Sequence, residues 1–186
     1  MNMQKTWVWC RLGGFVGVVG LTIAPGWMQP LLSQPAPPMV AQELVPQKLV
    51  PQRLVAQSFT AQKMRDLRQS NQRWIEVRLA TQRLVAWEGG KPVYAVIVST
   101  GKAGAETRSG VFAVQTRHRT ARMQGDDYDV PDVPYTMYYS GNYAIHGAYW
   151  HNRFGTRVSH GCVNVAVNHA KWLFSWASVG TPVVVH

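Results

Sequence analysis

The stretch "IEVRLATQRLVAWEGGKPVYAVIVST", residues 75–100, decides the fold of this chain. At its start, apolar side chains alternate with Glu76 and Arg78, which is the period-two pattern of a half-buried strand. Two more apolar runs, 84–87 and 93–100, lie on either side of the turn sequence EGGK. The stretch therefore predicts three successive antiparallel strands, a β-meander.

Three further apolar runs, at 111–116, 143–146 and 181–185, predict additional strands. Residues 117–137 lack such a pattern and contain four Asp and two Pro residues, so we expect a solvated loop there. The order of acidic residues and glycine in an EF-hand is missing from this segment, which argues against calcium binding.

One helix is predicted near the C-terminus, at residues 168–177 (NHAKWLFSWA). Asn168 is a suitable N-cap, and Gly180 lies just past the end. Many strands and a single C-terminal helix predict a mostly β fold, a β-sandwich or small barrel.

The N-terminus, residues 1–42, has the features of an export signal. Lys5 and Arg11 provide positive charge, 12–24 is a short apolar run, and the first acidic residue is Glu43. The run is short for a membrane span. Two alternatives stay open: a signal peptide that is cleaved near Glu43, or an uncleaved segment that anchors the protein to the membrane.

Residues 43–72 are rich in Pro and Gln, and 43–62 repeat with period five as ELVPQ, KLVPQ, RLVAQ and SFTAQ. A period of five fits neither a heptad nor a strand pair, and prolines interrupt helices. We therefore expect an unfolded tether here. A folded domain is predicted over residues 73–186.

The chain is basic, with 19 Lys and Arg against 9 Asp and Glu, a formal net charge of +10. Cleavage before Glu43 leaves 17 of the basic and all 9 acidic residues, a net +8. Such a charge favours anionic partners, for example an anionic cell wall. The chain has no dense Lys/Arg run and no nucleic-acid motif, so we expect no binding to nucleic acid.

The chain has two cysteines, and Cys10 leaves with a cleaved signal. Cys162, in "VSHGCVN", then has no partner for an internal disulfide. A cysteine nucleophile reacts as its thiolate and needs a nearby base. His146 and His160 are the candidates, and we favour His146 because it ends an apolar strand, which gives a base a rigid mount.

The third group of such a site need not be a carboxylate, because no Asp or Glu follows Asp132. The backbone carbonyl of Gly147 is our candidate for orienting the imidazole. Gly161 permits a sharp turn, so the amides of Gly161 and Cys162 are candidates for an oxyanion hole in acyl transfer.

A metal site is the rival interpretation of the same region. Its candidate ligands are His146, His151, His160, Cys162 and His169. These residues include no CxxC pair and no HExxH helix, which are typical of zinc sites. We therefore expect neither a metal nor a cofactor.

Several segments together resemble one family. "YAIHG" at 143–147, "SHGCVN" at 159–164, the strands over 75–114 and the closing "GTPVVV" are similar to the L,D-transpeptidase catalytic domain, the YkuD domain. The resemblance covers residues 73–186. It implies a YkuD-type β-sandwich that rebuilds bacterial peptidoglycan outside the cytoplasmic membrane, in the periplasm or cell envelope.

The resemblance also implies a reaction. A cysteine attacks the peptide bond after the third residue of a tetrapeptide stem and releases D-alanine. Transfer of the acyl group to the side-chain amine of another stem gives a 3→3 crosslink, and transfer to a lipoprotein amine anchors that protein. Transfer to water is carboxypeptidase action, which is the alternative within the enzyme class. An inactive wall-binding domain is the alternative outside it.

The family's functional residues map onto this sequence one by one. Cys162 becomes the nucleophile, His146 the general base and then acid, and Gly147 the donor of the orienting carbonyl. The active-site turn and oxyanion hole are then formed by Ser159, His160 and Gly161.

Substrate binding is less well defined by the family pattern. Asn164 stands where many members have Arg, which grips a carboxylate bidentately, whereas Asn only forms hydrogen bonds. Tyr135, Met137 and Tyr138 fall where the family carries part of its substrate cleft. Two alternatives stay open for each of them: it lines the cleft and binds substrate, or it serves only in packing.

Overall fold

A computed structural model describes residues 52–186. The predicted signal or anchor at 1–42 and the first part of the predicted tether lie outside the described residues. In chain order the elements are α1 (Gln52–Gln69), β1 (Arg73–Arg78), β2 (Arg83–Glu88), β3 (Lys91–Ile97), β4 (Gly110–Ala113), β5 (Thr116–Gly125), β6 (Tyr128–Ser140), β7 (Tyr143–Gly147), β8 (Val163–Val165), α2 (Val167–Trp176) and β9 (Pro182–Val185).

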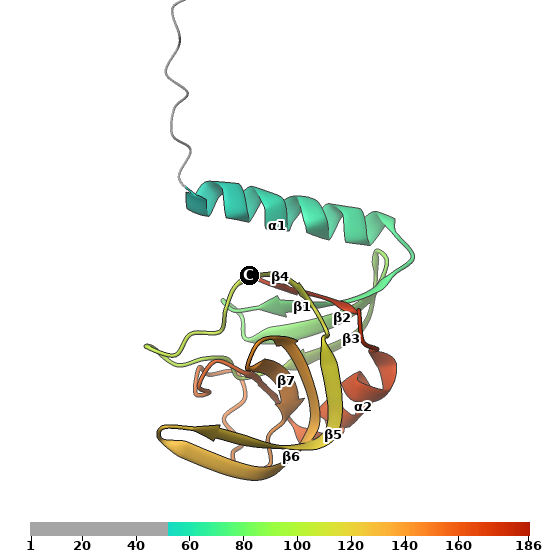
Figure 1. The fold of residues 1–186 in the computed structure, drawn as a ribbon. Coiled ribbons are helices and arrows are strands. Elements are labelled where there is room, and N and C mark those ends of the chain that lie inside the picture. Colours follow the sequence, from blue (N-terminus) through green and yellow to red (C-terminus); the bar gives the residue numbers. More distant parts are fainter. Residues whose placement is uncertain (1–51) are drawn as a thin grey trace, which may run out of the picture. The chain divides into compact units, whose positions relative to one another are not determined.

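The first sheet has five strands in the order β3-β2-β1-β9-β4 (Figure 1). Its β1, β2 and β3 pair antiparallel in sequence order, which confirms the predicted meander. The last strand, β9, inserts between β1 and β4 and runs parallel to β1. The two ends of the domain sequence are therefore held together in the centre of this sheet.

The second sheet has four strands in the order β5-β6-β7-β8, and its long β5–β6 hairpin corrects the loop predicted at 117–137. The segment gave no strand signal because β5 is largely exposed and polar on both faces. Pro131 lies in β6 where the register shifts between Ala121 and Met123, and such irregularities accommodate proline. The pairing is stable because β6 also pairs with β7.

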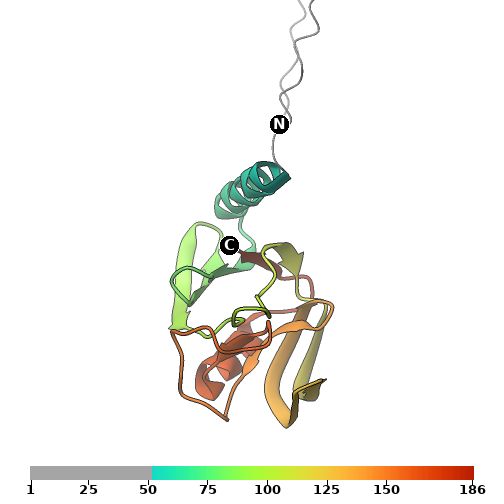
Figure 2. The same cartoon turned by 90° about the vertical axis from the view of Figure 1, so that its left-hand side faces the viewer.

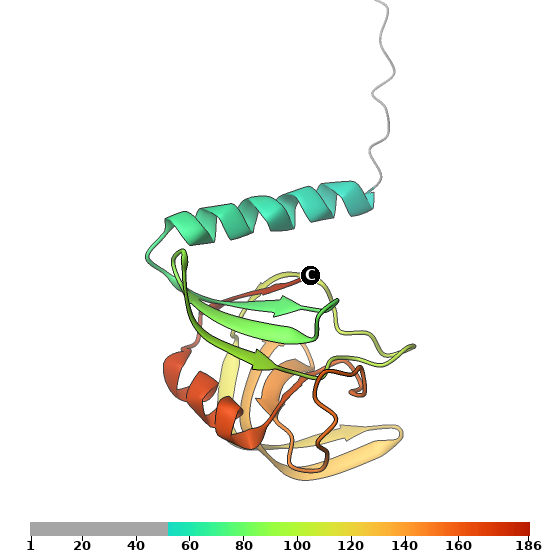
Figure 3. The ribbon, with the colours of Figure 1, turned by 180° about the vertical axis from the view of Figure 1, so that it is seen from behind.

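The core lies between the two sheets, as the predicted β-sandwich requires. Ile75 and Val77 of β1 pack in one cluster with Met137 and Ile145 of the second sheet and Leu173 of α2. Helix α2 contacts β6 and β7 (Figure 3). The mostly β fold with a helix near the C-terminus is thus confirmed.

Helix α2 begins one residue earlier than predicted. Its N-cap is Ala166, and no side chain caps the helix, so the capping role expected for Asn168 is wrong. Packing holds the helix instead: Leu173 is fully buried, and Trp172 stacks on Tyr94 of β3 with ring centroids 4.0 Å apart. Tertiary packing of an apolar face stabilises a short helix more than a cap does.

Helix α1 corrects the tether predicted at 43–72, because Gln52–Gln69 is helical. Pro51 is the last proline before Pro92, so no proline interrupts this part of the repeat, and its Ala, Leu, Gln, Lys and Arg residues favour a helix. Leu67 of α1 packs with Trp74 and Val184, all nearly fully buried. Neither helix of the described residues is long and apolar enough to cross a membrane.

The first sheet is consequently covered on both faces, by the second sheet on one and by α1 on the other. Figures 1 and 2 show α1 at the opposite end of the domain from the β5–β6 hairpin. The predicted half-buried pattern of β1 is therefore wrong for Glu76, which is only 2% exposed. Its carboxylate accepts hydrogen bonds from Arg78, Trp87 and His186.

These contacts set the charge of Glu76. Burial by itself raises the pKa of its carboxyl group, but the hydrogen bonds from His186, Arg78 and Trp87 outweigh burial and lower the pKa to about 2. Arg68 of α1 lies 4.0 Å from the same carboxylate. A buried, ionised and multiply bonded Glu76 thus lies where α1 meets the sheet.

Candidate active site

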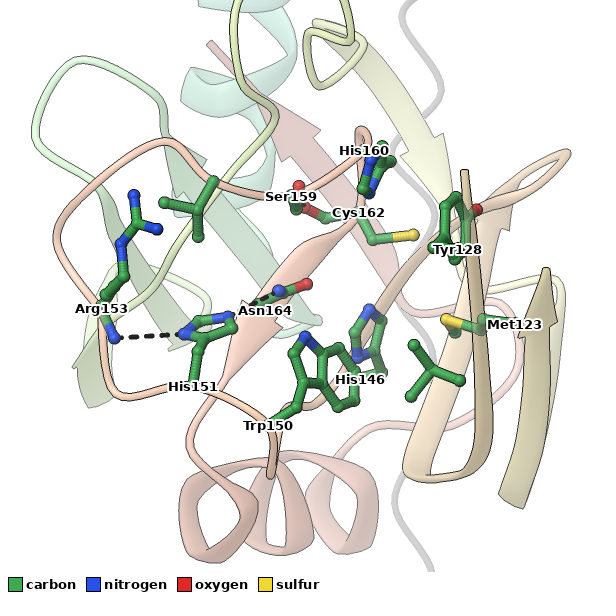
Figure 4. A pocket seen from close by; sticks show the side chains of 12 residues that line it. Met123, Tyr128, His146, Trp150, His151, Arg153, Ser159, His160, Cys162 and Asn164 are labelled. Carbon is green, nitrogen blue, oxygen red and sulfur yellow. Dashed lines mark hydrogen bonds between the residues drawn. The ribbon is translucent and has the colours of Figure 1, made fainter. Parts of the chain in front are cut away.

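A cavity of about 330 Å³ lies between the β5–β6 hairpin and the turn that precedes β8 (Figure 4). It brings together four of the sequence-predicted catalytic residues: His146, Ser159, His160 and Cys162. The lining residues are Met123, Tyr128, Val130, His146, Trp150, His151, Arg153, Val158, Ser159, His160, Cys162 and Asn164.

His146 is held rigidly at the base of this cavity. It lies on β7, which pairs with β6 on one side and β8 on the other, and it is 1% exposed. Its Nδ1 atom lies 3.1 Å from the carbonyl oxygen of Gly147. A carbonyl only accepts hydrogen bonds, so Nδ1 carries the proton and Nε2 has the free lone pair.

The environment keeps this imidazole neutral. Burial lowers the pKa of His146 to about 4, because the charged ring loses water; the hydrogen bond to Gly147 acts in the opposite direction, and the charge of His151 adds to the lowering. At neutral pH the ring is therefore a base with an unprotonated Nε2.

Cys162 stands at the end of the turn, just before β8, and is half-buried. Its thiol donates a hydrogen bond to the carbonyl oxygen of Asn142 at 3.6 Å. Burial raises the pKa of Cys162 to about 11, against a smaller lowering by a backbone hydrogen bond from Ala144. The free site thus holds a neutral thiol beside a neutral imidazole.

The turn at 159–162 is fixed by hydrogen bonds on both sides. The hydroxyl of Ser159 donates to the carbonyl of Cys162 at 2.5 Å. The hydroxyl of Thr107 donates to the carbonyl of Gly161 at 2.7 Å and accepts from the amide of Gly101 at 2.8 Å. The strand that follows this turn, β8, starts at Val163.

Gly161 is required by this turn. Its φ is +115°, a conformation that residues with a side chain rarely adopt. A Cβ atom there would lie 2.7 Å from the ring of Tyr143. The turn therefore tolerates only glycine at this position.

The expected oxyanion hole is corrected in one respect. The amide of Gly161 donates to the hydroxyl of Ser159 at 3.1 Å, so this amide does not face the cavity as a free donor. The amide of Cys162 donates to no backbone acceptor within residues 52–186. Of the two predicted donors, only the Cys162 amide stays available.

A comparison with protein families agrees with this arrangement. The family described as the L,D-transpeptidase catalytic domain, YkuD, matches residues 72–185. The chain belongs to this family. The match spans every strand of both sheets, as well as helix α2.

Individual proteins similar to this chain are also named L,D-transpeptidases. The chain is 30% identical over 118 residues to L,D-transpeptidase 2 of Mycobacterium tuberculosis, covering 56% of this chain and 29% of that protein. It is 32% identical over 134 residues to the probable L,D-transpeptidase ErfK/SrfK of Salmonella typhimurium, covering 60% and 43%. The chain thus spans less than half the length of either relative.

Solved structures show the same fold. The catalytic domain of the Enterococcus faecium L,D-transpeptidase is similar with a TM-score of 0.57 and 31% identity, covering 63% of this chain and 98% of that one. The likeness thus extends over nearly the whole of that catalytic domain.

His160 of this YkuD domain also lines the cavity, but its Nε2 atom contacts other side chains than the thiol. Its Nε2 atom lies 2.8 Å from Nζ of Lys102 and 3.0 Å from Oδ2 of Asp127. Its ring stacks on Tyr128 with centroids 4.5 Å apart. His160 thus links the active-site turn to the tip of the β5–β6 hairpin.

The three predicted cleft residues do not line the cavity. Met137 is fully buried in the core, and Tyr135 packs against Phe174 of α2, so the prediction is wrong for both. Tyr138 lies on β6 and packs edge-on against His118. A strand alternates its side chains between two faces, and Met137 lies on the face of β6 that packs into the core.

Several lining residues were missed by sequence reasoning. Trp150 stacks on His146 with centroids 5.7 Å apart, and Met123, Tyr128 and Val130 come from the hairpin predicted as a loop. The only signal in the sequence was the cluster "YWHNRF" soon after His146. Nothing local distinguishes such side chains from ordinary surface residues.

Proposed function

We propose that this protein is a peptidoglycan L,D-transpeptidase with Cys162 as its nucleophile and His146 as its general base and acid. One observation carries the proposal: Cys162 and His146 line a single cavity, and the carbonyl of Gly147 orients the imidazole. Membership of the YkuD family gives the reaction class. The stem-peptide substrate is inferred from that class.

In the acylation step, Nε2 of His146 takes the thiol proton as Sγ of Cys162 attacks the carbonyl carbon after the third residue of the stem. The amide of Cys162 stabilises the negative oxygen of the tetrahedral intermediate. The C–N bond then breaks, His146 returns the proton to the leaving amine, and D-alanine departs. A thioester between the stem and Cys162 remains.

In the second step the amine of an acceptor attacks the thioester carbonyl carbon. His146 takes a proton from the amine and gives it to the departing sulfur of Cys162, which restores the free thiol. If the amine belongs to the side chain of another stem, the new amide is a 3→3 crosslink. If it belongs to a protein, the product is an anchored protein.

The neutral state of the pair fits a general-base mechanism. With the pKa of the thiol near 11 and that of the imidazole near 4, proton transfer accompanies the attack rather than preceding it. The basic charge of the chain supports work against an anionic wall after export. The apolar run near the N-terminus supports that export.

The test is mass spectrometry of the full chain incubated with a disaccharide tetrapeptide, with and without a second tetrapeptide as acceptor. We expect an adduct on Cys162 with loss of D-alanine, followed by a dimeric muropeptide. Tripeptide product alone would instead identify a carboxypeptidase. The absence of adduct and product from folded protein would contradict the proposal and favour a wall-binding domain.

The matched control is Cys162→Ala. It removes the sulfur and leaves the fold unchanged, so circular dichroism stays the same while the adduct disappears. An active, folded Cys162→Ala variant would rule out the thioester mechanism.

A further inference from the structure

His151 bridges two groups on opposite sides of its ring. Its Nδ1 atom accepts a hydrogen bond from the backbone amide of Arg153 at 3.1 Å. Its Nε2 atom lies 2.8 Å from Nδ2 of Asn164 in the amide orientation that Figure 4 draws. All three residues line the cavity that holds Cys162 (Figure 4).

The chemistry of imidazole decides which end of the Asn164 amide faces His151. The backbone amide of Arg153 is a donor, so Nδ1 is unprotonated and the single proton of the neutral ring is on Nε2. An Nε2–H group needs an acceptor, and the acceptor in an amide is its oxygen. Two nitrogens that both carry hydrogen cannot form a hydrogen bond with each other, and amide oxygen and nitrogen are assigned from such networks. We therefore turn the amide over from the orientation drawn in Figure 4, so that Oδ1 of Asn164 faces His151.

The protonation state supports this assignment. Burial lowers the pKa of His151, and the positive charge of Arg153 lowers it further. The ring is therefore neutral at physiological pH, and it donates from one nitrogen only.

The NH2 group of Asn164 must then point the other way. Asn164 is 4% exposed, and its backbone amide and carbonyl both bond Ser99, at 2.8 and 2.9 Å. It is the register partner of His146 on the neighbouring strand. The end of its amide that points away from His151 is on the side where Cys162 and His146 lie (Figure 4).

We propose that His151 is a positioning residue that turns the amide of Asn164, so that the NH2 group donates a hydrogen bond to a backbone carbonyl oxygen of the bound stem peptide. The orientation follows from the contacts of His151 alone. The identity of the ligand rests on the proposed function. In this arrangement a neutral donor beside His146 selects a neutral acceptor on the substrate.

The first test measures the tautomer directly. Long-range ¹H–¹⁵N spectra of the full chain with ¹⁵N-labelled histidine distinguish protonated from unprotonated ring nitrogens, and His151→Phe assigns the signals. We expect His151 to be protonated on Nε2 only at neutral pH. A proton on Nδ1, or on both nitrogens, would overturn the orientation.

The second test measures substrate affinity. With a disaccharide tetrapeptide as donor, we expect His151→Phe to raise the half-saturating concentration for adduct formation about tenfold, the effect of one lost hydrogen bond. The maximal rate should change much less. His118→Phe is the control, because His118 is an exposed histidine of β5 outside the cavity lining. If the wild type and His151→Phe have the same half-saturating concentration of the tetrapeptide, the proposal is overturned.

A double-mutant cycle tests whether His151 acts through Asn164. In an Asn164→Ala background, His151→Phe should have no further effect on half-saturation, because the amide that it orients is gone. Additive effects would overturn the positioning role. If the wild type forms no adduct at all, the proposed function and the ligand fail together, and the tautomer still decides the orientation of Asn164.

Discussion

Nδ1 of His146 lies 3.1 Å from the carbonyl oxygen of Gly147, its own neighbour on β7. A backbone carbonyl therefore fills the orienting role that a carboxylate fills in many catalytic triads. A carbonyl is neutral, so it fixes the tautomer of His146 without strongly stabilising the charged ring. Burial outweighs this hydrogen bond, and the pKa of His146 stays low, at about 4.

The first prediction concerns pH. The pKa of His146 is lowered, so the base is unprotonated above about pH 4, and the pKa of the Cys162 thiol is about 11. The second-order rate constant for adduct formation should thus be flat across the neutral range and fall only as the pH drops through about 4. Stopped-time mass spectrometry across the pH range measures it. A fall in this rate constant centred near the ordinary histidine pKa of 6.5 would show that burial does not set the pKa of His146.

The second prediction concerns Gly161. Substitution Gly161→Ala forces a Cβ to within 2.7 Å of the Tyr143 ring at a φ of +115°, so the turn must move and adduct formation should be lost. Gly104→Ala is the control, since Gly104 also has positive φ but nothing lies within 4 Å of its Cβ position. The control costs about 1–2 kcal/mol of stability and keeps activity. Equal activity in the two variants would contradict the need for glycine at 161.

The third prediction concerns Glu76. Its pKa of about 2 lies below the ordinary 4.5, so its ionised form contributes stability above pH 4.5, and this contribution is lost as the pH falls from 4.5 to 2. Glu76→Gln should lower the free energy of unfolding by about 3 kcal/mol at neutral pH and much less near pH 2.

Urea unfolding at several pH values measures this effect, and Glu88→Gln is its control. The side chain of Glu88 is 43% exposed in its ion pair with Arg73, so its loss should cost less than about 1 kcal/mol. A Glu76→Gln penalty as small as that of the control, at every pH, would show that the buried carboxylate does not stabilise the fold.

The fourth prediction concerns α1. Leu67 is 2% exposed and packs on Trp74, so Leu67→Ala should lower the free energy of unfolding by about 2–4 kcal/mol. Leu54→Ala, on the same helix at 54% exposure, should change it by less than about 0.5 kcal/mol. Urea unfolding of the full chain compares the two. Equal small effects would mean that α1 does not cover the sheet.

Local sequence patterns predicted much of the fold. The meander at 73–97, the short strand at Tyr143–Gly147 and the C-terminal helix were predictable because period-two alternation and helical spacing are written in neighbouring residues. Cys162 and His146 were identifiable as candidates because few residue types serve as a nucleophile or as its base. The segment at 117–137 was not predictable, since a polar strand in a hairpin looks like a loop until its partner strand is known.

The sequence by itself indicated the candidate residues for the chemistry, and it determined the order of most strands. Only the tertiary structure decided which groups those residues meet. Burial of Glu76 under α1, the engagement of the Gly161 amide by Ser159 and the contact between His151 and Asn164 all join residues whose own neighbours in sequence give no sign of the contact. Hydrogen bonding and desolvation depend on what is close in space, and a linear pattern reports only what is close along the chain.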